Sequence, residues 1–385
     1  MYCIHITEVS AGSDSCFVFQ QIEKSPSMNI HVSSKPQTDE IELIIGNSNS
    51  NFSGVTSTML QVMSYQKERI NLRIMGTHFL PEPALAISFW QTAKMCRRPL
   101  KNGKWRIFHA RRVDEMIQGV LLKYLFRAKV ILVFSSAAQR KRSGTTVWLT
   151  RKMDAVIAVS KRSAGFLCDP PDLVNPHGVQ VNDYLPAKDK QQAWAELGFG
   201  GKYGIGILGR VRKQKGVHLF VEACIQLFDK YPDYHCVVVG AISSSNKEFV
   251  EQLKTKAAQA NMADRITFTG ELPFEQIPRI FSALSLVAAL SDNEGFGLTV
   301  LEAMSSGAAV LATEAGAWEE IIRPAVDGYI VPVNNQQAVT EKMDLLLSST
   351  EKLTQMGIEG RKRVEASYRV EDEATRLIAF FRSLQ

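Results

Sequence analysis

The chain has 385 residues, more than one ordinary hydrophobic core organises, so its length predicts two domains. The composition is that of a globular protein. Six scattered cysteines without a C-x-x-C pair argue against a disulfide framework or a structural zinc site and favour a cytoplasmic protein. The net charge of +6 is uneven: residues 90–165 hold 18 Lys and Arg against three acids, a local +15 that leaves −9 for the remainder. This stretch predicts an anionic partner, although a solvated charged surface is the simpler interpretation of a charge run.

No apolar run approaches the roughly 20 residues that cross a bilayer, so we expect any membrane contact to be peripheral. Residues 1–40 are Ser-rich and poorly periodic, and we expect a weakly ordered extension there. From residue 41 onward, short apolar runs alternate with amphipathic segments. Strands are expected at 41–45, 72–75, 106–109, 130–134 and 155–159, and helices at 56–65, 115–126 and 161–167.

A proline-rich stretch at 170–186 is typical of a linker, and a second alternating series follows it. Strands are expected at 203–208, 236–239, 266–269, 286–290, 309–312 and 329–333, and helices at 217–230, 247–259, 274–283, 298–305, 319–322 and 338–348. This alternation predicts parallel sheets covered on both faces. We therefore expect an α/β protein with two Rossmann-like domains, 41–185 and 186–368, facing each other across a cleft. An amphipathic segment at 369–385 is expected to return to the first domain.

The stretch from Glu294 to Glu302 follows a strand-like run and opens a helix-like one. Glycines at 295 and 297 let backbone N–H groups approach a ligand, and a helix N-terminus favours negative charge, so a phosphate fits there. Glu302 would lie on roughly the same side of the helix as Glu294 but deeper, because eight positions make a little over two turns. Carboxylates accept hydrogen bonds from sugar or ribose hydroxyls. The plain alternative is a helix start whose first acid complements the helix dipole and whose second acid is solvated, and the placement of the glycines disfavours it.

A second motif, residues 209–216, follows the first expected strand of the second half and is bounded by glycines. Arg210 and Lys215 can neutralise a diphosphate there, the guanidinium by forking onto two oxygens and the ammonium as a point charge. The loop is not a Walker A motif. Taken alone, an exposed basic loop explains this segment equally well.

Together, G-R-x-x-x-x-K-G at 209–216 and E-G-F-G-x-x-x-x-E at 294–302 resemble the retaining family-4 glycosyltransferases, which have the GT-B fold. The segments 175–179, 266–270 and 303–307 continue this resemblance, which covers the chain from about residue 42 to its end. It implies an enzyme that transfers a hexose from a nucleotide sugar and keeps the anomeric configuration. It also implies that neither a metal nor another cofactor is needed, and no D-x-D motif is present.

The resemblance assigns roles to the matching residues. Arg210 and Lys215 would hold the donor diphosphate, and Glu294 would bind the transferred sugar. His109 keeps the first histidine of the family's H-x-H motif and Arg111 stands in place of the second, so either side chain is a candidate to touch the reacting sugar. The remaining donor contacts would come from Gly54, Phe296, Gly297, Leu298, Thr299 and Glu302. No enzymatic nucleophile is expected, because a front-face route lets the departing diphosphate help deprotonate the acceptor.

Residues 53–58, 105–112 and 135–140 are similar to those of bacterial lipopolysaccharide core mannosyltransferases. This narrower resemblance implies GDP-mannose as the donor and an anionic Kdo–lipid A acceptor at the inner face of the cytoplasmic membrane. Such an acceptor would account for the basic stretch. We expect the acceptor or an acidic membrane surface to contact Arg97, Arg98, Arg112, Arg140, Lys141 and Arg142.

Three alternatives remain. A family-4 enzyme that uses a UDP-sugar on another glycolipid or glycan would carry the same motifs. A sugar-nucleotide epimerase of the same fold would need a pair of acid and base carboxylates in the first domain, and none stands out there. A nucleic-acid-binding protein would interleave aromatic residues with its charges. The aromatic residues of the basic stretch are expected at strand or core positions instead, so no nucleic-acid partner is expected: Trp90, Trp105, Phe108 and Trp148.

Overall fold

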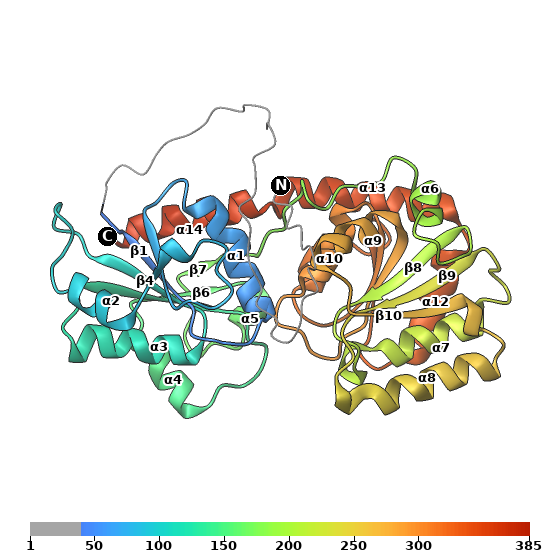
Figure 1. Ribbon diagram of the computed structural model, residues 1–385, viewed down its shortest axis with the longest axis horizontal. Coiled ribbons are helices and arrows are strands. Elements are labelled where there is room, and N and C mark those ends of the chain that lie inside the picture. The colour runs from blue at the N-terminus through green and yellow to red at the C-terminus, as the bar shows by residue number, and fades with distance from the viewer. Residues whose placement is uncertain (1–39) are drawn as a thin grey trace, which may run out of the picture.

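The computed structural model describes residues 40–385, so the extension expected at 1–40 lies outside the described residues except for its last residue. The described part consists of two parallel sheets in two domains that stand side by side (Figure 1). The predicted α/β architecture of two Rossmann-like domains is therefore confirmed. None of the helices between residues 40 and 385 has the length and apolar content needed to cross a bilayer.

The first domain contains a seven-stranded sheet in the order β3-β2-β1-β4-β5-β6-β7. Its strands are β1 Leu43–Gly46, β2 Leu72–Met75, β3 Ala86–Ile87, β4 Arg106–Ala110, β5 Val130–Ser136, β6 Ala155–Ala158 and β7 Leu173–Val174. Successive residues of β1 enter opposite cores: Leu43 and Ile45 face one, and Ile44 faces the other. Both faces of this sheet are therefore buried, which explains its nearly continuous apolar strands.

Helices cover both faces of the first sheet. Their bounds are α1 Gly54–Gln66, α2 Phe89–Met95, α3 Val113–Val120, α4 Gly144–Thr150 and α5 Lys161–Ala164, with the short helices η1 Pro83–Leu85 and η2 Leu121–Leu125. Buried side chains of α1 share one core with the last helix of the chain, while those of α2, α3 and α4 share the other. The helix η2 is a π-helix that continues α3 without a break.

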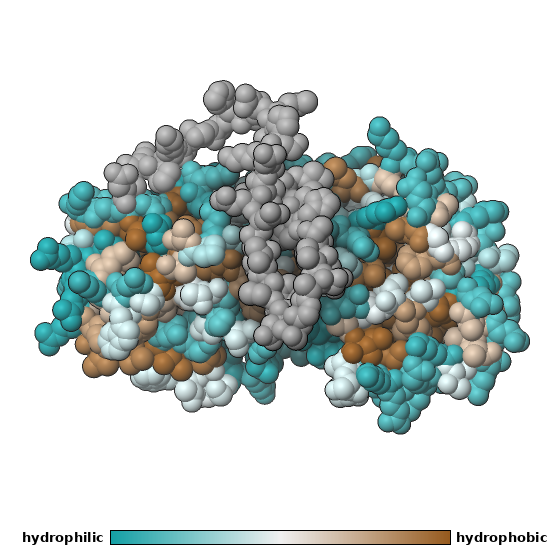
Figure 2. All heavy atoms as spheres, in the orientation of Figure 1, coloured by the Kyte–Doolittle hydropathy of each residue, from teal (hydrophilic) through white to brown (hydrophobic). Residues whose placement is uncertain are grey.

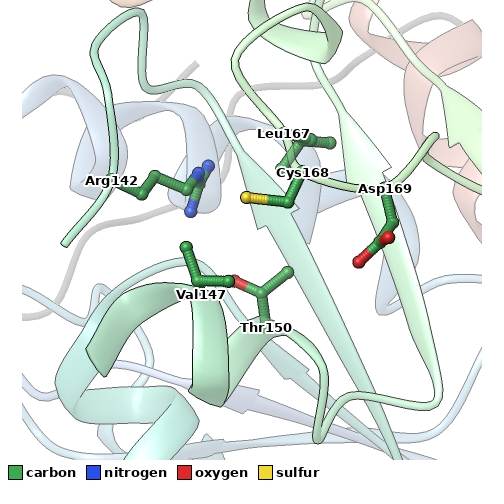
Figure 3. Close-up of a pocket in the computed structure, with 6 residues that line it drawn as sticks. All are labelled: Arg142, Val147, Thr150, Leu167, Cys168 and Asp169. Atoms are coloured by element: carbon green, nitrogen blue, oxygen red, sulfur yellow. The ribbon is translucent and has the colours of Figure 1, made fainter. Parts of the chain in front are cut away.

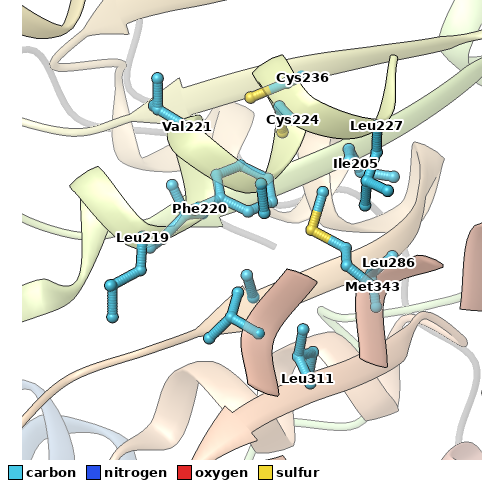
Figure 4. Close-up of a cluster of buried hydrophobic side chains, with 14 of the residues drawn as sticks. Ile205, Leu219, Phe220, Val221, Cys224, Leu227, Cys236, Leu286, Leu311 and Met343 are labelled. Atoms are coloured by element: carbon cyan, nitrogen blue, oxygen red, sulfur yellow. The ribbon is translucent and has the colours of Figure 1, made fainter. Parts of the chain in front are cut away.

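The second domain contains a six-stranded sheet in the order β10-β9-β8-β11-β12-β13. Its strands are β8 Tyr203–Leu208, β9 Tyr234–Val239, β10 Ile266–Gly270, β11 Leu284–Ala289, β12 Ala309–Thr313 and β13 Gly328–Val331. Its helices are α6 Lys190–Ala195, α7 Val217–Leu227, α8 Lys247–Gln259, α9 Ile277–Ala283, α10 Leu298–Ser305, α11 Trp318–Ile321, α12 Gln336–Leu347 and α13 Thr350–Ser367, with the short helices η3 Lys213–Lys215, η4 Ser244–Asn246, η5 Ala263–Arg265 and η6 Phe274–Gln276. Phe220 of α7, Met343 of α12 and Leu286 of β11 meet in one of its two cores (Figure 4).

The last helix, α14 Val370–Leu384, lies in the first domain although α13 before it belongs to the second (Figure 1). It packs against α1, and its Phe381 is fully buried. The sequence analysis predicted this helix but did not predict α2, α4, α6 or α13. The longest of these, α13, escaped because it is rich in Lys, Arg and Glu and buries only a narrow stripe.

Replacing Phe381 with alanine should destabilise the first domain, because the buried ring would leave a cavity between α14 and the sheet. We expect the free energy of unfolding to fall by about 3–5 kcal/mol, measured by urea denaturation followed by circular dichroism. Phe274→Ala is the control, because the Phe274 ring is 64% exposed in the second domain. Equal stability of the two variants would contradict the packing of α14 on this domain.

Candidate active site

The loop after β11 turns the chain into α10 and presents backbone amides at the turn. Gly297 directly precedes the helix with a φ of +85°, and a Cβ at this position would lie 2.3 Å from Nε1 of Trp318. The indole N–H of Trp318 donates to the Gly297 carbonyl at 2.9 Å and holds the turn. Leu298 and Thr299 begin the helix, so their amides have no intrahelical acceptor. This helix start is suited to an anion.

Lys215 and Glu294 form an ion pair across a sequence separation of 79 residues. Nζ of Lys215 donates to Oε2 of Glu294, and the two side chains remain 24% and 23% exposed. Gly216 allows the basic loop to press on the end of β11: its φ is +70°, and a Cβ there would lie 2.2 Å from the Leu290 carbonyl oxygen. The two motifs singled out in the sequence are therefore joined through their charged groups. Phe296, which lies in the chain between Glu294 and the start of α10, is buried.

Loops at the carboxyl ends of the two sheets meet at the junction between the domains. Arg210, which follows β8, donates from Nη2 to the carbonyl of Phe52 at 3.2 Å. Gln139, which follows β5, donates from Nε2 to the carbonyl of Gly295 at 2.8 Å. The predicted donor-binding loops thus face the first domain at the strand ends where open parallel sheets bind ligands.

The start of α1 is braced by Arg112. Ser53 caps the helix by accepting from the amide of Thr56 at 3.4 Å. Arg112 donates to the hydroxyls of Ser53 and Thr56 at 3.1 and 2.9 Å and pairs with Glu115 at 2.9 Å. With 14% of its side chain exposed, Arg112 holds this loop rather than lying on the open surface expected for it. Gly54 has no atom within 4 Å of a Cβ position, so the helix start is open to a ligand.

Glu302 lies on α10 below the loop that carries Glu294. Its Oε1 accepts from the hydroxyl of Tyr184 at 3.1 Å. Burial raises the pKa of Glu302 to about 7, and this hydrogen bond opposes the shift only in part. The carboxyl group therefore titrates near neutral pH, unlike an exposed glutamate.

His109 is buried at the end of β4. Its Nε2 lies 2.7 Å from the Ser135 hydroxyl, and its ring contacts the ring of Phe381 with centroids 5.1 Å apart. Burial, with Arg111 and His177 nearby, holds the pKa of His109 well below its ordinary value, so the imidazole is neutral. Its Nδ1 is buried and has no hydrogen-bond partner among residues 40–385. His109 thus sits in the protein interior with one ring nitrogen unused.

Arg111, the other candidate at this strand end, also has an unused polar atom. Its backbone N–H donates to Glu115 at 2.7 Å, but Nη1 of its guanidinium is buried and has no partner in the part of the chain that the structure describes. Burial lowers the pKa of Arg111, while Glu115 and Glu373 oppose this shift. Buried donors are almost always satisfied, so an unsatisfied guanidinium at the strand end is a candidate ligand contact.

Sequence reasoning assigned no role to His177, which links the domains beside the site. Its Nδ1 lies 2.8 Å from Oε1 of Glu373 on α14, and its ring contacts the ring of Phe296 with centroids 5.0 Å apart. The other oxygen of Glu373 accepts from the amide of Gly178 at 2.7 Å. The segment 175–179 had been noticed only as a continuation of the family pattern. No sequence signal connects it to a glutamate almost 200 residues away.

The five other basic residues expected at an acceptor or membrane surface fall into separate places. Arg97 and Arg98 are exposed after α2, whereas Arg140 and Lys141 are exposed on the loop that also carries Gln139. Arg142 is partly buried: it donates to Ser136 and lies over the Phe134 ring, 5.4 Å from its centroid. It also lines a small, open recess (Figure 3), together with Val147, Thr150, Leu167, Cys168 and Asp169.

Comparison with known proteins identifies the family. The family model described as glycosyl transferases group 1 matches residues 189–363. The chain is also 37% identical over 350 residues to the lipopolysaccharide core biosynthesis mannosyltransferase LpcC of Rhizobium leguminosarum bv. viciae, which covers 91% of this chain and 98% of that protein. The chain belongs to the group 1 glycosyltransferases.

Two further similarities concern this glycosyltransferase over most of its length. It is 36% identical over 349 residues to the lipopolysaccharide core biosynthesis mannosyltransferase LpsB of Rhizobium meliloti (strain 1021), covering 90% of this chain and 98% of that one. The crystal structure of Anabaena Alr3699/HepE in complex with UDP has the same fold, with a TM-score of 0.74, 17% identity, and coverage of 89% of this chain and 100% of that one. The predicted family and GT-B fold are confirmed, while the roles of individual residues stay predictions.

Lys215→Ala and Glu294→Gln should each lower turnover by about 100-fold or more, because each removes a charged group that is predicted to bind the donor. Initial rates of nucleoside diphosphate release in the presence of acceptor measure the effect. Lys213→Ala is the matched control, since Lys213 is exposed on the same basic loop. All three variants should keep the parent melting temperature within a few degrees. Full activity of either site variant would refute the assignment.

Nucleotide affinity should increase as the pH is raised through about 7, the pKa of Glu302. If Glu302 binds the ribose as predicted, its ionised carboxylate would accept hydrogen bonds from the ribose hydroxyls, and protonation at lower pH would weaken that acceptance. Isothermal titration calorimetry with the nucleoside diphosphate on both sides of this pKa measures the change. Glu302→Gln should remove this part of the pH dependence and leave the part due to the ligand's own phosphate. The same pH profile in both proteins would exclude Glu302 from ribose binding.

Proposed function

We propose that this glycosyltransferase transfers mannose from GDP-mannose to a lipopolysaccharide inner-core acceptor of the Kdo–lipid A type, with retention of the anomeric configuration. The similarity to two proteins named lipopolysaccharide core biosynthesis mannosyltransferases, over 91% and 90% of the chain, carries this proposal. It extends through both domains and so includes the first, in which the sequence analysis expects the acceptor to bind.

The ion pair between Lys215 and Glu294 supports the donor side of the proposal. A diphosphate carries more negative charge than one carboxylate, so Lys215 would turn toward it and Glu294 would then accept from hydroxyls of the sugar. Arg210 stands at the same junction and would meet the second phosphate. Before the donor binds, Lys215 and Glu294 neutralise each other, so neither partly buried charge lacks an opposite charge.

Retention follows if the acceptor hydroxyl attacks from the face that the diphosphate leaves. The departing phosphate oxygen takes the proton of that hydroxyl, while Arg210 and Lys215 stabilise the negative charge that develops on the leaving group. No side chain is proposed as a nucleophile. No metal is required in this scheme, and within residues 40–385 no group of three or more His, Cys, Asp or Glu is arranged to hold one.

Arg140 and Lys141 support an anionic acceptor. Both are exposed on the loop between β5 and α4, whose Gln139 contacts Gly295 beside the proposed sugar site. Kdo carboxylates and lipid A phosphates would be attracted to these two cations. We propose that the enzyme works at the inner face of the cytoplasmic membrane, in peripheral contact with it.

A thermal-shift screen with GDP-mannose, GDP, UDP-glucose, UDP-N-acetylglucosamine and UDP tests the donor. GDP and GDP-mannose should selectively raise the melting temperature, because binding at 100 times the dissociation constant stabilises the folded state by about 2.7 kcal/mol. Lys215→Ala should reduce the shift. A shift that is selective for UDP compounds would leave the proposed reaction type in place but would contradict GDP-mannose as the donor.

The acceptor is then tested by incubating enzyme and GDP-mannose with Kdo–lipid A and, as control, with lipid A lacking Kdo. The proposal expects a product heavier by one hexose with the first acceptor only, detected by mass spectrometry, and an α-linkage by nuclear magnetic resonance. Addition to neither acceptor would overturn the acceptor assignment without affecting the donor result.

A further inference from the structure

The outer side of α3 and η2 carries a stripe of exposed apolar side chains. Val113, Ile117, Leu121 and Leu125 recur every four residues and are 41%, 43%, 40% and 67% exposed. The opposite side of the same helix is buried in the core through Met116 and Leu122 among others. The helix is thus apolar on both sides, although only one side packs on the sheet. A helix that presents such a stripe to solvent has an unused binding face.

Large aromatic side chains flank this stripe. Trp90 of α2 is 68% exposed and contacts Phe126, which directly follows η2, with ring centroids 5.3 Å apart. Trp148 is 54% exposed on α4, which packs against α3. Figure 2 shows hydrophobic side chains gathered along the edge of the first domain where Figure 1 places α3. We call the exposed side of α3 and η2, with Trp90 and Trp148, the α3 face.

The charges around the α3 face are mostly positive. Exposed basic side chains lie on α2 and in the connections after η2 and α4: Lys94, Arg127, Arg151 and Lys152. Of these, Arg151 is paired with Asp169 at 3.4 Å. Residues 88–154 contain three acids, and two of these are neutralised: Asp154 by Lys123 at 2.5 Å and Glu115 by Arg112. The surface therefore combines an apolar centre with a basic surround.

We propose that the α3 face docks on an anionic lipid bilayer, with the apolar stripe in the boundary between headgroups and acyl chains. Helices of this kind lie in the interface plane, with Trp at the boundary and Lys and Arg reaching the headgroups. Basic residues near an anionic membrane surface each add to the attraction. A second copy of this chain is a poorer occupant, because a two-fold contact would place this basic surround against itself.

The position of α3 relates this face to the active site. The helix begins directly after Arg112, at the end of the loop that leaves β4 beside His109. It runs from the junction edge outward for about 20 Å at the usual helical rise. A bilayer against the α3 face would therefore meet the junction at its edge, where the head of a lipid-linked acceptor would be delivered. Only this last point rests on the proposed function.

Co-sedimentation with vesicles that contain no acceptor tests the docking. The probe is an equal mixture of phosphatidylglycerol and phosphatidylcholine, compared with phosphatidylcholine alone, using the full-length protein. The parent should bind the anionic vesicles more strongly, and the double variant Leu121→Ser, Leu125→Ser should bind them at least about tenfold more weakly. The matched control is Phe274→Ser, Ile358→Ser, which removes two exposed apolar side chains from the second domain and should bind like the parent.

Both double variants should keep the parent melting temperature, because all four side chains are substantially exposed. Unchanged vesicle binding by the α3 variant would overturn the proposal. The proposal would also be overturned if the α3 variant loses self-association in analytical ultracentrifugation but still binds vesicles. The α3 face would then be a contact between copies of this chain. Transfer to a detergent-solubilised acceptor should be the same in the α3 variant and the parent. If transfer fails in both while vesicle binding differs as expected, the proposed function fails and the docking proposal stands.

Discussion

Within residues 40–385 the chain passes between the two domains twice, and the arrangement of the site depends on how these two passes are joined. The amide of Val179 donates to the carbonyl of Tyr368 at 2.8 Å, and the amide of Val370 donates back to Val179 at 3.2 Å. Glu373 adds its carboxylate, which accepts from Gly178 and pairs with His177. Two connections bound to each other limit how the domains can rotate, and so the loops at the ends of the two sheets remain opposite one another.

The charged groups at this junction are held in two different ways. Lys215 and Glu294 stay partly exposed and compensate each other, so either can exchange its partner for a ligand at modest cost. Glu302 and His109 are buried instead. Burial raises the pKa of Glu302 and lowers that of His109, and both shifts favour the neutral form of the side chain. The charged pair therefore lies partly exposed at the junction, whereas Glu302 and His109 are buried. Of these two buried groups, Glu302 titrates near neutral pH and His109 remains neutral.

Much of the fold could be predicted from the sequence because strands buried on both faces are continuous apolar runs, and every expected strand has a counterpart in the structure. The helices that were not predicted have only a weak apolar pattern. The short α2 and α4 bury few residues, and α13 is mostly polar with a narrow buried stripe. The basic loop and the glycine-bounded turn before α10 could be recognised in the sequence. Glycine sets the local backbone conformation, and a helix start attracts an anion, so neither signal depends on a residue far away in the sequence.

By itself, the sequence determined the two parallel sheets, the family, and which glycine-bounded loops carry the charges that are predicted to bind a donor. Only the tertiary structure decided which side chains meet: Lys215 with Glu294, and His177 with a glutamate of the last helix. It also decided that Arg112 braces α1 instead of facing solvent, and that the outer side of α3 has no covering layer within the described residues. The physical reason is that periodicity reports which side chains are apolar, whereas exposure and pairing depend on strand order and on the contact between domains.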